Sequence, residues 1–340
     1  MSADNEIDRI AEVAESDLLA VILPIYENAL AAIDAQTIEA VLNNFEDAEH
    51  TSAQLSAALG FYNEDFEPLR ELILDEDSPT SPIGGLAELF AGVAILAAAM
   101  FGSAFLDNHP LFRAGRAEYA RDAIRRLYAD DSTFMRDAID RAVNSSGTTT
   151  AIARQLRRSV GLTTTQAKQL DTMRRFLHDE IAAGTTRLNG QARLDAVSAR
   201  VQRLRGHVTA PQRQMIFAAL TNPGKFTPDH ADALLDRHAT ALRKHRMKVA
   251  AAMHTHTATE GGKLIGWQIA EALGAVPVGT KRFWRTAADE RVRHAHAQVP
   301  RMNASGVALN EPFDTPLGLV MIPPLEINCR CRVYVRKPQT

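Results

Sequence analysis

Hydrophobic residues recur every three or four positions along much of this chain, and this spacing places them on one face of a helix. Near the N-terminus, Ile10, Val13 and Val21 follow the pattern, so we expect a helix there. Pro24 falls inside the same apolar stretch. Because proline lacks the backbone donor that a helix needs, we expect a kink or break near Leu23.

The same spacing predicts helices through the middle of the chain, with starts at the threonine clusters Thr148–Thr150 and Thr163–Thr165. A long helix is expected over 229–258. The predicted secondary structure then changes from helix to strand, because Lys281–Trp284 and Arg332–Arg336 have the composition of strands. The sequence therefore predicts a mainly α fold with a small α+β C-terminal domain.

One segment is apolar enough to raise a second interpretation. Leu89–Leu106 contains eighteen residues without a charge, which is the lower limit for a membrane-spanning helix. Its many alanines and glycines are only weakly apolar and favour close helix packing. We expect a helix buried in a bundle, with conditional membrane insertion as the alternative.

Composition and charge divide the chain. The 340 residues, 46% hydrophobic and 23% charged, have the composition of a globular protein. Residues 1–80 carry a net charge of −17 and the remainder +14, and a linker rich in Asp, Ser, Pro and Gly spans 75–85. We expect an acidic helical arm over 1–78, a basic helical region over 83–222 and a C-terminal module over 226–336.

The basic region contains a candidate DNA contact. Arg154, Arg157 and Arg158 fall mostly on one side of a predicted helix, where they could contact phosphates without reading sequence. Since nothing defines a recognition helix, sequence-specific binding is not expected. An ordinary solvated helix face is the alternative.

The side chains that could form a chemical site are concentrated between residues 284 and 331. Two stretches, W-R-T-A-A-D-E-R-V-R-H-A-H and N-C-R-C, bring together aromatic, charged, imidazole and thiol groups: Trp284, Thr286, Asp289, Arg291, Arg293, His296, Asn328, Cys329, Arg330 and Cys331. The two cysteines are too close in sequence for an ordinary disulfide. One interpretation is a polar core in which Asp289 accepts from Arg291, Arg293 or Arg330, His296 caps the loop, and the cysteines pack as small buried groups.

These two stretches resemble the C-terminal module of the Mu F-like minor head proteins of tailed phages. That module carries W-x-T-x-x-D-x-R-x-R-x-x-H and a terminal N-C-R-C, and Phe313 and Pro323-Pro324 match two further positions. A weaker likeness covers 161–177. The chain departs from the family at Met253–His256, where two histidines replace the Arg and Glu of A-R-T-E.

The resemblance implies a minor head protein that is incorporated with the portal, lies inside the capsid and assists genome packaging or ejection. The partners implied are the portal protein, other capsid or scaffold proteins, a further copy of this chain and packaged DNA. The N-terminus lacks the basic and apolar regions of a signal peptide, so we expect assembly in the host cytoplasm.

The resemblance also implies a candidate structural zinc site, because some relatives carry a four-ligand pattern here. His296, Cys329 and Cys331 remain in this chain, with Glu326 as a candidate fourth ligand. A complete set of cysteine and histidine ligands is absent from the motif, so the sequence leaves the protein without a firmly expected cofactor.

Two other functions stay open. An ejected protein could act on the host membrane through Leu89–Leu106, and a phage-borne enzyme or toxin is a third reading. We expect no enzyme, since the sequence has no nucleophile elbow, phosphate-binding loop or zinc-protease motif. His238, His245 and His256 share one predicted helix face, either as a polar stripe or as a proton-sensitive contact.

Overall fold

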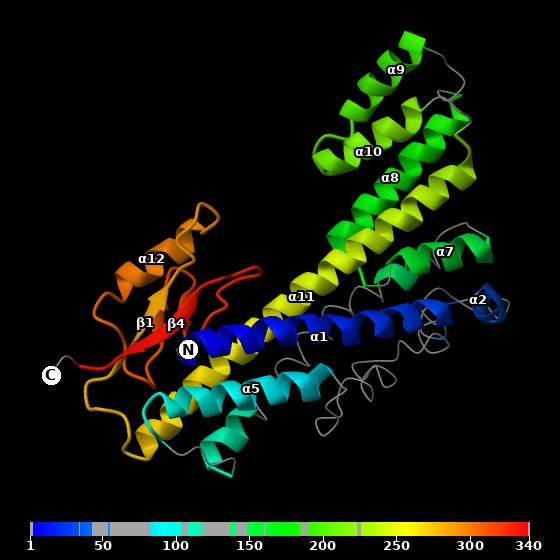
Figure 1. Ribbon diagram of the computed structural model, residues 1–340. Coiled ribbons are helices and arrows are strands. Elements are labelled where there is room, and N and C mark those ends of the chain that lie inside the picture. Colours follow the sequence, from blue (N-terminus) through cyan, green and yellow to red (C-terminus); the bar gives the residue numbers. More distant parts are fainter. Residues whose placement is uncertain are drawn as a thin grey trace. The chain divides into compact units, whose positions relative to one another are not determined.

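A computed structural model describes residues 3–33, 35–42, 54, 82–103, 108–116, 119, 137–140, 148–159, 161–184, 190–222 and 226–338 (Figure 1). The described chain is mostly helical, with a small antiparallel strand region near the C-terminus, which confirms the predicted fold class. The helices are α1 (Ala3–Ala32), α2 (Ala35–Leu42), α5 (Pro82–Ala99), α7 (Thr149–Ser159), α8 (Thr164–Ala182), α9 (Gly190–Gln202), α10 (Ala210–Thr221), α11 (Pro228–Ala272) and α12 (His294–Met302). The strands are β1 (Lys281–Arg285), β2 (Phe313–Thr315), β3 (Gly318–Val320) and β4 (Arg332–Arg336).

The chain forms two compact units. We call the one that comprises Met1–Ile25, Asp65–Tyr128 and Met247–Thr340 the C-terminal unit, and the one that comprises Tyr26–Glu64 and Ala129–Arg246 the central unit. This division differs from the predicted one, because residues 226–246 belong to the central unit. The reason is that the first half of α11 supplies apolar residues to the core of α8, α9 and α10.

In the central unit, α8 and α10 begin with the same capping arrangement. The side chain of Thr163 accepts a hydrogen bond from the backbone of Gln166, and the Gln166 side chain returns one to Thr163. Thr209 and Gln212 repeat this arrangement at the start of α10. Such capping boxes satisfy donors that a helix start leaves free, and the helix start predicted at Thr163–Thr165 is confirmed.

The expected break near Leu23 is wrong. Helix α1 continues through Pro24 to Ala32. Pro24 is exposed. A proline inside a helix removes one backbone hydrogen bond and can kink the helix without ending it.

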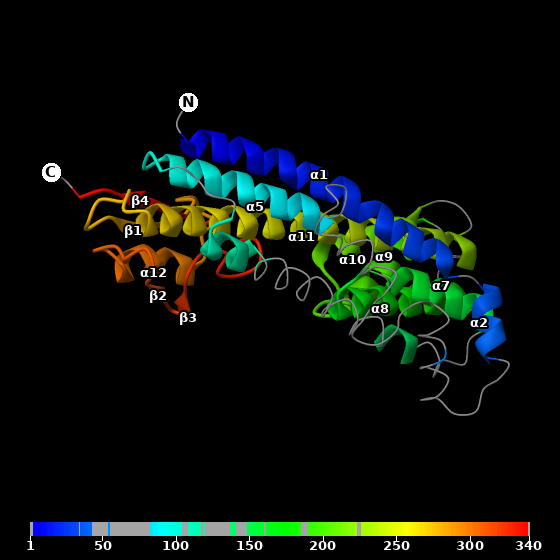
Figure 2. The same ribbon diagram turned by 90° about the horizontal axis from the view of Figure 1, so that it is seen from below.

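In the C-terminal unit, α5 runs alongside the second half of α11, with the first half of α1 next to it (Figures 1 and 2). Gly262 and Gly266 of α11 face α5 so closely that a Cβ on Gly266 would lie 2.3 Å from the Ala94 carbonyl oxygen. Ala94 and Ala97, two small residues of the apolar segment, therefore pack closely against Gly266 of α11. The helix ends at Ala99, and 104–106 lie outside the described residues.

No helix in the described part of the chain combines the length and the apolar character that a membrane crossing requires.

In the view of Figure 1, the strand pair β1–β4 lies between α12 and the second half of α11. Both strands were predicted from the sequence and are confirmed, and they pair antiparallel with Trp284 opposite Val333. Their inward residues join Trp267 of α11 and Phe313 of β2 in one apolar core. The segment that leads into β4 is thereby held against the long helix.

Gly266→Ala tests the close contact between α5 and α11. We expect the substitution to lower the free energy of unfolding by about 1–3 kcal/mol, since the added methyl group overpacks the interface. Gly92→Ala on α5 is the matched control, because a Cβ there would meet nothing within 4 Å; it should be neutral or stabilising by up to about 1 kcal/mol. Urea unfolding followed by circular dichroism measures both, and equal effects would contradict the packing.

Candidate metal centre

The site lies where the segment before β4 meets the first turn of α12. Burial alternates along N-C-R-C, with Cys329 and Cys331 buried and Arg330 exposed, so both thiols project to the same side. Asn328 precedes them with a φ of 60°, a left-handed conformation that asparagine tolerates better than most residues. The turn at Asn328 directs the two thiols toward α12.

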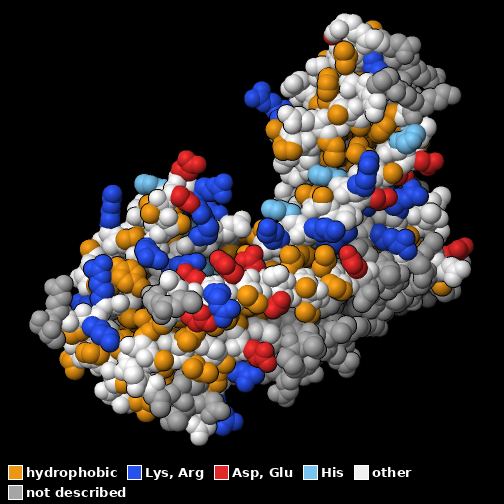
Figure 3. Space-filling model, viewed as in Figure 1, with side chains coloured by type: hydrophobic (Ala, Val, Ile, Leu, Met, Phe, Trp, Pro, Cys, Tyr) orange, Lys and Arg blue, Asp and Glu red, His pale blue; other side chains and the backbone are white. Residues whose placement is uncertain are grey.

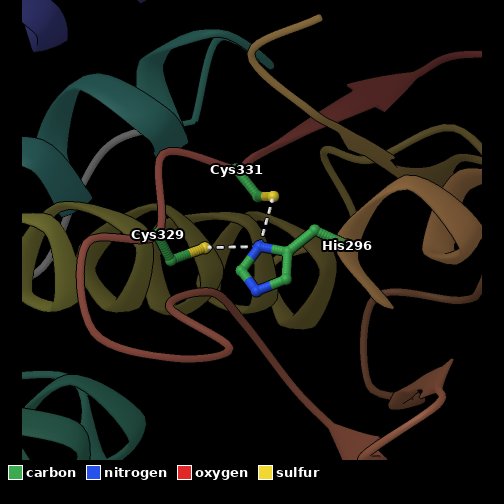
Figure 4. A group of neighbouring side chains, drawn as sticks. All are labelled: His296, Cys329 and Cys331. Atoms are coloured by element: carbon green, nitrogen blue, oxygen red, sulfur yellow. Dashed lines mark hydrogen bonds between the residues drawn. The ribbon is translucent and has the colours of Figure 1, made fainter. Parts of the chain in front are cut away.

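His296 completes a buried cluster with the two cysteines. Its Nδ1 is 3.5 Å from each sulfur, and the three side chains converge on one point (Figure 4). The exposed fractions are 3% for His296, 6% for Cys329 and 2% for Cys331. The three ligand atoms lie within 4.8 Å of one another, an arrangement that can hold a metal ion.

The space at this cluster is small. A cavity of about 20 Å³ is lined by His296, Cys329 and Cys331 together with residues of the loop 287–293. Such a volume accepts roughly one water-sized particle. It accommodates an ion and excludes an organic substrate.

Glu326 is placed differently from the expectation that it is a metal ligand. Its Oε2 is 3.0 Å from Nε2 of His296, on the other side of the ring from the sulfurs. In metal sites, a carboxylate in this position orients the imidazole and raises the basicity of the ligating nitrogen. Glu326 is therefore corrected from a ligand to an outer partner of His296.

The two thiols affect each other's ionisation. The hydrogen bond with Cys331 lowers the pKa of the Cys329 thiol, against the effect of burial, and His256 acts in the same direction. The same hydrogen bond, together with burial, raises the pKa of Cys331. The site therefore favours deprotonation of Cys329, and the thiolate is the form in which cysteine binds metals.

The charged residues of the motif lie at the surface. Arg330 donates to both carboxylate oxygens of Asp289, at 2.6 and 2.8 Å, and this contact lowers the pKa of Asp289. Arg291 contributes its backbone N–H, at 3.1 Å, and Arg293 donates to the Ile327 carbonyl. Of the three arginines considered for Asp289, Arg330 makes the ion pair, and the pair is exposed instead of forming a polar core.

Acidic and basic side chains lie side by side where α1, β1 and β4 come together (Figure 3). Here Arg332 pairs with Asp8 of α1. Thr286 accepts a hydrogen bond from the Ala288 backbone. These contacts fix the loop after β1 and the start of β4 around the cluster.

Arg282 is a residue whose role the sequence did not reveal. It is fully buried in β1 and donates to the carbonyl oxygens of Met321, Ala308 and Glu311. Burial lowers its pKa to about 10, so it stays charged at neutral pH. Because residues two apart in a strand share a face, its place two positions before the buried Trp284 was the available signal.

The three arginines proposed to contact DNA are engaged within the central unit. The Arg158 side chain is 6% exposed and pairs with Asp232 and Asp236 of α11. Arg157 donates to the Ile33 carbonyl, and Arg154, which is 43% exposed, also pairs with Asp232. Arg158 is therefore not a surface contact for phosphate, because its charge is used inside the fold.

The histidines of α11 have separate environments. His238 Nε2 is 3.1 Å from the Gln212 side-chain nitrogen, and burial lowers the pKa of His238. His245 is exposed. His256 lies in the C-terminal unit, near Cys329.

Comparisons with protein-family models, with curated proteins and with solved structures give no match for this chain. The functional argument therefore depends on the residues of the motif and on their placement.

Arg158→Ala tests whether the arginines of α7 stabilise the fold or bind DNA. Burial acts to raise the pKa of Asp232, but Arg158 lowers it overall, so removing Arg158 leaves a partly buried carboxylate without its main partner. We expect a loss of about 3 kcal/mol in the free energy of unfolding, as for other broken buried pairs. The more exposed Arg154→Ala should cost less than about 1 kcal/mol.

Urea unfolding measures these losses, and DNA mobility shifts at two salt concentrations provide the second measurement. A stable Arg158→Ala protein with weakened, salt-dependent DNA binding would contradict the structural role.

Proposed function

We propose that this protein is a minor head protein of a tailed phage, a structural component of the virion and not an enzyme. One observation supports the proposal: the residues of the 284–331 motif, on which the stronger part of the resemblance depends, lie in one compact unit around a single buried cluster. Trp284 and Phe313 form its apolar side, His296 and the two cysteines its centre, and Asp289 with Arg330 its outer clamp.

The form of the cluster supports a structural role. The two thiols belong to an apolar core, and His296, Cys329 and Cys331 together line a cavity of only about 20 Å³, while Cys329 alone of the three also lines a wider groove. Structural metal sites are closed in this way, whereas catalytic ones keep an open position for water or substrate. The motif accordingly stabilises a module that takes part in assembly.

Zinc is the metal that these donors fit best. Thiolate and imidazole ligands in a small site favour Zn²⁺ over Mg²⁺ or Ca²⁺, which take oxygen ligands. Cys329, Cys331 and His296 would hold the ion, and Glu326 would orient His296. A bound zinc would supply folding free energy by cross-linking the segment before β4 to α12.

The charge distribution of the sequence supports the partners that the resemblance implies. The acidic N-terminal residues are suited to the portal, a scaffold protein or another copy of this chain, while the basic remainder can lie near packaged DNA. Arg158 of α7 does not contribute to that surface, because its side chain is buried and paired within the fold. The proposed location is the capsid interior near the portal, after assembly in the host cytoplasm.

Quantitative mass spectrometry of purified particles tests the proposal. We expect this chain in the particle at a low copy number that matches the portal, since a portal-associated component is limited by portal symmetry. The major capsid protein and the portal in the same sample serve as internal references. Particles that are complete without this chain would contradict a virion role.

Metal analysis of the purified full-length protein tests the zinc site separately. We expect about one zinc per chain in the wild type and a loss of zinc in Cys329→Ser/Cys331→Ser, because thiolates are the strongest ligands of the set. Asp289→Asn is the control, since it changes the outer clamp and no ligand. Equal zinc content in the wild type and the double variant would exclude the site.

A further inference from the structure

The His296–Cys329–Cys331 cluster supplies three ligands, and a closed structural zinc site takes four. A fourth donor must therefore come from a neighbouring element. Helix α11 passes directly beside the segment that carries the two cysteines, so its side chains are the first to consider.

One face of α11 contacts the segment 328–333 near both of its ends. The Asn328 backbone N–H donates to the Met253 sulfur at 3.2 Å. Seven residues later on the helix, Glu260 accepts a hydrogen bond from the Val333 backbone N–H at 2.9 Å. Positions three and seven residues apart share a helix face, so His256 lies between these two contacts, at the level of Cys329.

The imidazole of His256 has an unused nitrogen at this position. Its Nε2 is buried and has no hydrogen-bond partner among the described residues, although buried polar atoms are normally paired. His256 and Cys329 both line a groove of about 570 Å³ between α11, α1 and the loop after β1. The ligand atoms that lie within 4.8 Å of one another are those of His296, Cys329 and Cys331, so the His256 side chain would turn toward them to bind. A buried nitrogen that has no hydrogen-bond partner and lines the same groove as a cysteine of the cluster can supply the fourth donor, and the groove gives an ion access to it.

Glu12 and Glu15 of α1 also line the groove, but they are carboxylates, and a carboxylate is a poorer fourth ligand here for the charge reason given below. Three other carboxylates near the cluster are already paired. Glu326 is bound to the far nitrogen of His296, and Asp289 is held by Arg330. Glu260 pairs with Lys263 at 2.7 Å. His254 is not among the residues that line either cavity at the cluster.

We infer that His256 is the fourth ligand, so that His256, His296, Cys329 and Cys331 form a Cys₂His₂ zinc site that joins α11 to β4 and α12. Two thiolates balance the charge of Zn²⁺, and two neutral imidazoles leave the buried site without net charge, which avoids the cost of an unpaired buried charge. A carboxylate as the fourth ligand would leave one negative charge. The inference depends on the zinc site proposed above and is independent of the virion role.

Metal binding by the full-length protein tests the assignment. Co²⁺ is titrated into metal-free protein, and Zn²⁺ affinity is measured by competition with a chelator. Co²⁺ absorbs strongly in the visible range when it is tetrahedral and weakly when added water makes it six-coordinate, and the band positions change when one of four ligands is exchanged. We compare the wild type with His256→Ala, with His254→Ala as the matched control on the same helix, and with Glu326→Gln.

We expect His256→Ala to shift or weaken the visible bands, because water replaces an imidazole, and to bind Zn²⁺ more than about 100-fold less tightly, beyond the 10–100-fold that loss of an outer partner costs. Glu326→Gln should fall within that 10–100-fold range and keep the tetrahedral spectrum. His254→Ala should bind both metals as the wild type does.

His256→Cys keeps the test decisive if His256→Ala folds poorly. The new thiolate should restore the tetrahedral bands and increase the sulfur-to-cobalt charge-transfer absorption above that of the wild type. A His256→Ala protein with the spectrum and affinity of the wild type would overturn the assignment of His256 alone. A wild type that binds neither metal would overturn the zinc site itself.

Discussion

The C-terminal unit depends on a carboxylate that is buried in the middle of the long helix. Glu260 is 1% exposed, pairs with Lys263 on one oxygen and accepts the Val333 backbone N–H on the other. Because a buried charge is costly unless it is paired and hydrogen-bonded, this carboxylate is satisfied only when β4 lies in this register against α11. The strand pair, its core and the position of the two thiols follow from that contact.

Small residues explain why α5 and α11 pack so closely in this unit. Gly262 and Gly266 follow Glu260 along α11 and allow the α5 backbone to approach closely. Phe90, Val93, Ala94 and Ala97 of α5 are buried, so the apolar segment forms a protein core along its helical part. Its low charge is explained by packing, without any need for lipid.

Local signals predicted the local features of this fold. Threonine caps marked helix starts, and the composition of Lys281–Trp284 marked β1, because both depend on neighbouring residues alone. The sequence also placed His296, Cys329 and Cys331 in one candidate site. It could not identify the acidic partners of Arg158, since these lie more than seventy residues away on α11, nor the side of the His296 ring that Glu326 occupies, because ring orientation is set by tertiary packing.

The chemistry of the cluster supports the proposed metal site. Two thiols and an imidazole nitrogen meet in a buried position, where a thiolate would be costly without a partner. Arg330 lies between the cysteines in sequence, is exposed and makes its ion pair with Asp289. A divalent cation at the convergence of the two sulfurs and Nδ1 of His296 would neutralise two thiolates together. The packing that holds these groups at one point is therefore suited to the metal that we propose.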